Sequence, residues 1–185
     1  MLTVGHSTHS IERFLELLTG AHVEAIADVR RHPGSRRHPH FGADALAGSL
    51  ARESIGYESF GEELGGRRRP TARRGVEAPS PPLPDNSAWR NASFRAYADY
   101  LNTAAFAAGL ERLEKLAELR TTAIMCAEAQ PINCHRRLIS DVLVTRGWAV
   151  LHLLADGRLS AHALSDHAEV ENGRVFYPGH PRLDL

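Results

Sequence analysis

The chain has 185 residues, of which 43% are hydrophobic and 24% are charged, and its formal net charge is zero. This length fits one domain that can bury a substantial core without disulfides or structural metals, and the composition excludes a largely disordered chain. The zero net charge excludes a bulk attraction for nucleic acid or for an anionic membrane, so any anion site must be local.

The first third of the chain alternates between short apolar runs and amphipathic segments, as strands and helices do. Ser10 can cap the first expected helix and Gly20 can end it. The second expected strand is too apolar to be half exposed, which is typical of a parallel sheet covered on both faces. In chain order, the expected elements are a strand over 2–5, a helix over 11–20, a strand over 23–29, a polar loop over 30–42, a helix over 43–56 and a short strand over 57–60.

The middle of the chain is rich in glycine, proline and arginine over 61–89, which is much longer than a normal connection. We interpret residues 67–90 as a mobile loop or lid. The remaining expected elements are a helix over 93–103 capped by Ser93, a helix over 104–119, a strand over 121–128, a helix over 134–147 closed by Gly147, a strand over 148–154, and a tail over 157–185 with a short helix and an extended end.

Repeated alternation of strand and helix predicts a single α/β domain over residues 1–185. Its sheet is expected to be open and mostly parallel, with helices on both faces and the long Arg- and Pro-rich loop as an insertion. In such sheets, ligands bind beyond the carboxyl ends of the strands. The loops after the strands over 2–5, 23–29 and 121–128 should therefore converge at one site.

Short motifs lie at the ends of three expected strands and within the Gly-, Pro- and Arg-rich segment over 61–89. They are Gly5-His6-Ser7, Asp28-Val29-Arg30, Leu64-Gly65-Gly66, and Cys126-Ala127-Glu128 with Cys134-His135-Arg136. Through these motifs, and through "FRAYADYL" and "LISDVLVTRGW", nearly the whole chain closely resembles the bacterial and archaeal family known as domain of unknown function number 488. It departs from that family in the Pro-rich stretch over 75–84. The resemblance implies an α/β fold without specifying an activity.

The two cysteines offer three kinds of chemistry. Cys134 is expected near a helix start, where the helix dipole, Arg136 and Arg137 favour a thiolate, so it is the better candidate nucleophile. A metal site could instead use Cys126, Cys134 and His135, with His6 as a further candidate, and would suit zinc or iron. A thiol redox pair requires the two Cα atoms to lie about 4.4–6.8 Å apart. The alternative to all three is that both cysteines are structural. Composition predicts no particular cofactor.

Asp28 and Glu128 are carboxylates at the ends of two strands that we expect to be neighbours. Such a pair can divide general acid and general base roles if burial separates their pKa values. The alternative is structural pairing of Asp28 with Arg36 and of Glu128 with Arg136. His6 is a further candidate general base.

Arginine clusters in the expected loops suggest anion recognition, because a guanidinium forms two hydrogen bonds with a phosphate or carboxylate. Solvated charge on a mobile loop is the alternative. The expected catalytic residues are Asp28, Glu128, His6 and Cys134. The expected substrate-binding residues are Ser7, Arg30, Arg36, Gly65, Gly66, Cys126, His135 and Arg136.

We therefore expect an enzyme that catalyses hydrolysis or group transfer on a phosphorylated or nucleobase-bearing substrate, either free or within DNA or RNA. The alternatives are a metal- or anion-binding module without turnover and a thiol redox protein. The sequence has no run of about 18 apolar residues and no signal-peptide pattern, so we expect a cytoplasmic protein that does not bind membranes.

Overall fold

The computed structural model describes residues 1–34, 36–66, 68 and 85–179. The strands of this part are β1 (Leu2–Gly5), β2 (Ala25–Asp28), β3 (Gly56–Ser59), β4 (Thr122–Cys126), β5 (Leu151–Leu153), β6 (Leu159–Ala161), β7 (Glu169–Glu171) and β8 (Arg174–Phe176). Its α-helices are α1 (Ile11–Gly20), α2 (Ala43–Arg52), α3 (Gly61–Leu64), α4 (Ala92–Tyr100), α5 (Ala104–Leu119) and α6 (Arg136–Thr145). Two short 3-10 helices are η1 (Pro39–Phe41) and η2 (Pro131–Asn133).

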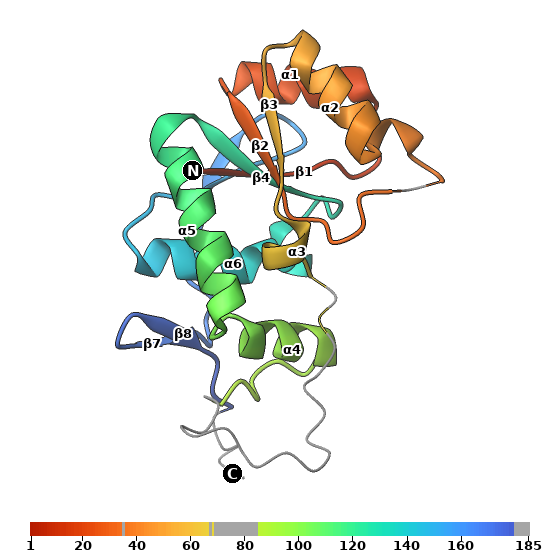
Figure 1. Cartoon of the computed structure of the whole chain (residues 1–185). Coiled ribbons are helices and arrows are strands. Elements are labelled where there is room, and N and C mark those ends of the chain that lie inside the picture. The colour runs from red at the N-terminus through yellow and green to blue at the C-terminus, as the bar shows by residue number, and fades with distance from the viewer. Residues whose placement is uncertain (35, 67, 69–84, 180–185) are drawn as a thin grey trace.

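The first six strands form one sheet in the order β3-β2-β4-β1-β5-β6 (Figure 1). Strands β1 to β5 are parallel, and β6 pairs with β5 in the antiparallel direction. β7 and β8 form a separate antiparallel hairpin. The fold is therefore the open, mostly parallel α/β sheet that the alternation of elements predicts, and β6 is an antiparallel edge strand that the sequence did not indicate.

Both faces of the sheet are buried by helices, as expected. Alternate residues of β4 point to the two faces because side chains of a strand alternate in direction. Ala123 and Met125 belong to the core that includes residues of α1 and α2, whereas Ile124 and Cys126 belong to the core that includes residues of α5 and α6. Figure 1 shows these helix pairs on opposite sides of the sheet. All four residues are buried, which explains why the strand reads as a continuous apolar run.

Two predictions about secondary structure need correction: the cap of one helix and the helix expected in the tail. Ser93 does not cap the helix that follows the insertion: α4 begins at Ala92, and the Asn91 side chain accepts a hydrogen bond from the Ser93 N–H. The described part of the tail, which ends at Gly179, contains no helix and instead forms β6, β7 and β8. These strands have three residues each, which is too short to show a period in the sequence.

Residues 67 and 69–84, where we predicted most of the mobile loop or lid, lie outside the described residues. The described flanks make specific contacts. Arg68 donates hydrogen bonds to carbonyl groups of α3 and of Gly65, and its guanidinium lies 3.8 Å from the centre of the Tyr100 ring. Among the described helices, none has both the length and the apolar character required to span a bilayer.

Candidate active site

A cavity of about 510 Å³ lies at the carboxyl edge of the sheet. It is lined by the loops that follow β1, β2 and β4, which are neighbouring parallel strands, and by residues of α4. The three loops therefore converge as the sequence predicts. The predicted site residues that line the cavity are His6, Ser7, Arg30, Gly66, Cys126, Glu128, Cys134 and His135.

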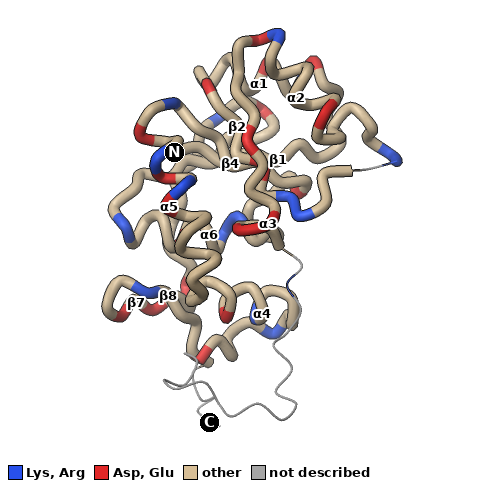
Figure 2. Tube along the Cα trace, viewed as in Figure 1, with Lys and Arg blue, Asp and Glu red and all other residues tan. Residues whose placement is uncertain are grey.

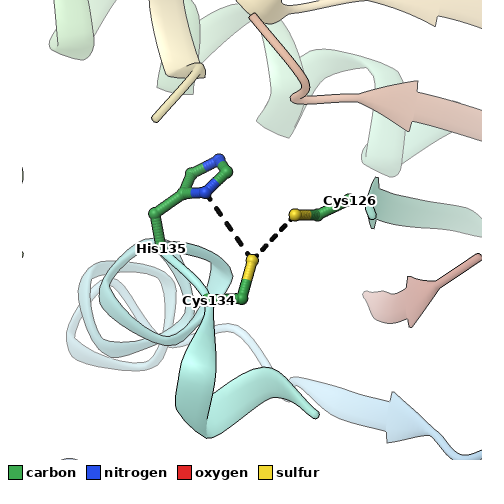
Figure 3. A group of neighbouring side chains, drawn as sticks. All are labelled: Cys126, Cys134 and His135. Carbon is green, nitrogen blue, oxygen red and sulfur yellow. Dashed lines mark hydrogen bonds between the residues drawn. The ribbon is translucent and has the colours of Figure 1, made fainter. Parts of the chain in front are cut away.

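The two cysteines point toward one another beside the cavity (Figure 3). Cys126 ends β4 and Cys134 follows η2, and their Sγ atoms are hydrogen-bonded at 2.9 Å. Burial opposes ionisation of Cys134, but the hydrogen bond with Cys126 and the charge of Arg136 lower the pKa of its thiol to about 6. The same hydrogen bond, together with burial, raises the pKa of Cys126 to about 12. Cys134 is thus the more acidic of the two thiols.

His135 is held by the chain around it. Its Nε2 lies 3.2 Å from the Val29 carbonyl oxygen, and its Nδ1 lies 3.6 Å from the Sγ of Cys134. A carbonyl oxygen only accepts hydrogen bonds, so the ring proton is on Nε2 and the lone pair of Nδ1 is directed at the thiol. Gly66 leaves room for this ring, because a Cβ at residue 66 would lie 2.9 Å from Nδ1. In the Leu64-Gly65-Gly66 motif, the missing side chain of Gly66 therefore leaves the space that the His135 ring occupies.

Arg136 does not line the cavity but lies behind the cysteines, with an exposed fraction of 1%. Its Nη2 donates to the carbonyl oxygens of Glu128 and Ala129, and its Nη1 donates to the Thr3 hydroxyl at 3.3 Å. The guanidinium thus contacts the Glu128 backbone rather than the Glu128 carboxylate with which we considered pairing it. No carboxylate forms a salt bridge with this buried cation among the described residues.

A chain of hydrogen bonds links Arg136 to a distant carboxylate. From the Thr3 hydroxyl it continues to His152 Nδ1 at 2.7 Å, from His152 Nε2 to His162 Nδ1 at 3.0 Å, and from His162 Nε2 to the Asp141 carboxylate at 2.8 Å. We call Arg136, Thr3, His152, His162 and Asp141 the buried polar chain.

One arrangement of protons satisfies every contact of the buried polar chain. Arg136 can only donate, so Thr3 accepts from it, and in this arrangement Thr3 uses its own hydroxyl proton to donate to His152. His152 is then a neutral ring that donates through Nε2 to His162, and Nε2 of His162 donates to the Asp141 carboxylate at the end. Burial, followed by the charges of His162 and Arg136, lowers the pKa of His152 to about 4, which agrees with a neutral ring. The buried polar chain therefore connects the Arg136 guanidinium to the Asp141 carboxylate by hydrogen bonds.

Replacing His152 by glutamine is expected to reduce the pH dependence of stability. In the unfolded chain His152 takes up a proton near its ordinary pKa of 6.5, but in the folded chain only near 4. The unfolded state binds more protons between these values, so the free energy of unfolding falls as the pH is lowered from 6.5 toward 4. The variant should take up about one proton fewer on unfolding in this window. Urea unfolding at about pH 7.5 and about pH 5 measures the difference.

His167→Gln is the control for this prediction, because His167 is an exposed histidine outside the buried polar chain. This control should keep the pH dependence of the parent protein. Equal pH dependence in His152→Gln and the parent protein would contradict the assignment of a neutral His152.

Asp28 does not line the cavity and is completely buried beneath it. Its carboxylate accepts hydrogen bonds from the backbone and the guanidinium of Arg30, and from the Tyr57 hydroxyl. This is the structural pairing that we considered, but the partner is Arg30 rather than Arg36. The predicted catalytic role of Asp28 would require access that this position does not give.

His6 lies at the cavity wall, with its ring stacked on Phe41 at 4.1 Å between centroids. Burial and the nearby Arg30 charge lower the pKa of His6 to about 4. Arg30 Nη1 lies 3.2 Å from His6 Nε2, and since the guanidinium only donates, the ring lone pair accepts from Arg30. His6 therefore positions Arg30, and its lone pair is not available to a substrate in this arrangement.

The other predicted site residues differ in their access to the cavity. Glu128 lines it with an exposed side chain, and Ser7 lines it with φ at 47°, a left-handed backbone conformation. Arg36 is exposed and outside the lining, and Gly65 packs against Gly61 and Arg31. Arg36 and Gly65 therefore do not belong to the predicted site residues that the structure brings together at the cavity.

Several lining residues are not among the site residues that we predicted from the sequence. They are Arg31, His32, His38, Ser93, Phe94, Tyr97 and Asn133. Arg31 directly follows the Asp-Val-Arg motif, so the doubled arginine at the end of a strand was the available signal. Phe94 and Tyr97 belong to α4. From the sequence they were aromatic residues that could either stack a base or pack in the core, and no local pattern indicated that they reach this cavity.

The fold and the cavity define an α/β protein with a thiol-containing pocket at the carboxyl edge of a parallel sheet. The family model described as domain of unknown function DUF488 matches residues 10–143. The chain belongs to this family. No curated protein and no solved structure matches the chain.

Proposed function

We propose that the chain is an enzyme that binds a phosphorylated or nucleobase-bearing substrate in this cavity and catalyses hydrolysis or group transfer. The observation that carries the proposal is that basic, aromatic and acidic side chains line the same cavity of about 510 Å³. Arg31 and His32 supply basic groups, Phe94 supplies an aromatic ring, and Glu128 supplies a group that exchanges protons. A cavity of this size accommodates a small ligand such as a mononucleotide.

The basic side of the cavity suits a phosphate. Arg31 is exposed at the cavity and makes no hydrogen bond or ion pair with another described residue, so its guanidinium is available to an anion. Arg30 is already engaged by Asp28 and His6. In Figure 2, basic segments lie beside α3 and beside α6. Local charge of this kind attracts an anion even in a chain of zero net charge.

The aromatic side of the cavity suits a base. Phe94 is half-buried and stacks on Trp89 at 5.0 Å between centroids, which holds its ring in place. Stacking of a base on an aromatic side chain is worth about 1–3 kcal/mol. We place the protein in the cytoplasm, where thiols such as Cys126 and Cys134 remain reduced. A free nucleotide and a base turned out of DNA or RNA, including a damaged base, both have the chemistry that this cavity would recognise.

Binding of labelled mononucleotides and of short single- and double-stranded DNA, with intact and damaged bases, tests the proposal. We expect binding that weakens as salt is raised. Phe94→Ala and Arg31→Gln should each weaken it about tenfold, because one loses stacking and the other a phosphate contact. Arg13→Gln is the control, since Arg13 pairs with Glu16 on the exposed surface of α1. Absence of binding at low salt for every ligand would overturn the proposal.

A further inference from the structure

We infer that Cys126, Cys134 and His135 form a site for one transition metal ion of zinc-like ligand preference, with a fourth coordination position open to the cavity. The catalytic meaning of the site rests on the proposed function, but metal binding itself requires no substrate. Two thiols and an imidazole are the ligands that zinc prefers.

The ligand atoms are close to the spacing that such an ion requires (Figure 3). Their Sγ and Nδ1 atoms all lie within 4.8 Å of one another. Around a tetrahedral zinc ion, a sulfur and a nitrogen ligand are about 3.6 Å apart and two sulfur ligands about 3.8 Å apart. The distance from Cys134 Sγ to His135 Nδ1 is already 3.6 Å, and the sulfur atoms, now 2.9 Å apart, need to separate by only about 0.9 Å.

The imidazole is oriented as a ligand before any ion binds. His135 Nε2 donates to the Val29 carbonyl, which leaves the Nδ1 lone pair directed at the cysteines. Metal-binding histidines commonly donate their other ring N–H to a carbonyl or carboxylate in this way. Gly66 and the edge-on Tyr97 ring, 5.1 Å away, confine the imidazole from two sides. Gly66, the last residue of the Leu64-Gly65-Gly66 motif, thus helps to position His135, one of the three proposed ligands.

The surroundings of Cys134 also suit a thiolate ligand. The Arg136 backbone N–H donates to its Sγ at 3.5 Å, and the Arg136 guanidinium is a buried cation nearby. Binding of a divalent ion displaces the thiol protons of both cysteines to solvent, so the two thiolates neutralise the charge of the ion.

The site has an open position. Among the described residues, no fourth histidine, cysteine, aspartate or glutamate belongs to the group. All three ligands line the cavity, so water or a substrate atom can reach the ion from there. Three protein ligands with one open position are typical of catalytic rather than structural zinc sites. A metal-bound water would supply the nucleophile that hydrolysis requires.

Titration of the reduced, chelator-treated full-length protein with Zn²⁺ and with Co²⁺ tests the site. We expect one ion per chain, and with Co²⁺ the visible absorption of tetrahedral thiolate coordination. Cys126→Ser, Cys134→Ser and His135→Gln should each weaken binding at least about 100-fold. His32→Gln is the matched control, because His32 lines the same cavity outside the group, and it should bind as the parent protein does. Circular dichroism checks that each variant is folded.

A measurement on the unaltered protein keeps the test independent of the variants. Bound Zn²⁺ should slow alkylation of both thiols, and a chelator should restore it. Absence of stoichiometric binding by the reduced protein, or equal loss of affinity in His32→Gln and His135→Gln, would overturn the inference. Formation of a Cys126–Cys134 disulfide with oxidised glutathione, in a protein that binds no Co²⁺, would replace it with the thiol redox function. Nucleotide binding without metal binding overturns only the metal site, and metal binding without nucleotide binding overturns only the proposed substrate.

Discussion

Replacing Asp28 by alanine is expected to lower the free energy of unfolding by about 3–5 kcal/mol, because it leaves a buried cation without its partner. The Asp28 side chain is 1% exposed and the Arg30 side chain 8% exposed. The change also removes the acceptor of the Tyr57 hydroxyl and of the Arg30 backbone N–H. Urea unfolding of the variant at neutral pH measures the loss.

The chain contains a matched control for this prediction. Asp156 and Arg158 repeat the same two-residue spacing, the same backbone hydrogen bond and a salt bridge of the same 2.6 Å length. That pair is exposed, and exposed ion pairs contribute little because water screens them. Asp156→Ala should therefore leave the unfolding curve almost unchanged. Similar losses in Asp28→Ala and Asp156→Ala would show that burial does not determine the contribution of the pair.

Replacing Gly5 by alanine is expected to destabilise the protein by about 3 kcal/mol and to distort the cavity. A Cβ at residue 5 would overlap the carbonyl group of Glu128 and would lie 2.9 Å from the Arg136 guanidinium. Neither neighbour can move freely, since Arg136 itself donates to that carbonyl. The loop between Cys126 and Cys134 must therefore shift, and we expect weaker binding of both Co²⁺ and nucleotide. Urea unfolding and the two titrations measure these effects.

Gly48→Ala is the control for this second prediction. Gly48 lies within α2, and a Cβ there meets nothing within 4 Å. Alanine is a better helix former than glycine, so this variant should be more stable by about 0.5–1 kcal/mol. An unchanged stability and an unchanged cavity in Gly5→Ala would contradict the close approach of Glu128 to β1.

The sheet and its helices could be predicted because their signals are local. The helix over 104–119 and the strand over 2–5 agree with α5 and β1 at both ends, since each depends on its own apolar spacing and caps. The convergence of the loops after β1, β2 and β4 also followed, because the carboxyl ends of parallel strands share one edge. Short elements such as β7 and β8 have no period to detect, and their pairing depends on contacts with distant segments.

The roles of the charged residues within the site could only partly be predicted. The sequence left a catalytic Asp28 and a paired Asp28 open as alternatives, and it suggested Arg36 as the partner. The structure pairs Asp28 with Arg30, which the loop geometry determines. The buried polar chain was not predicted at all. His152 lies in a strand and His162 in the tail, and only the sheet order brings them beside Thr3. The one local signal for the buried polar chain was His152, a histidine within an apolar expected strand.

The position of β1 in the sheet determines when during synthesis the site can form. β1 precedes the other strands in the chain, yet it pairs with β4 and β5, and the contact between Thr3 and His152 spans 149 positions of the chain. Contacts of such sequence separation slow folding, because a long loop must close before they are gained. The sheet therefore cannot be completed until β5 and β6, the last of its strands in chain order, have been translated. Until then the edge of β1 that pairs with β5 remains unpaired, which leaves an apolar strand edge of the partly synthesised sheet exposed.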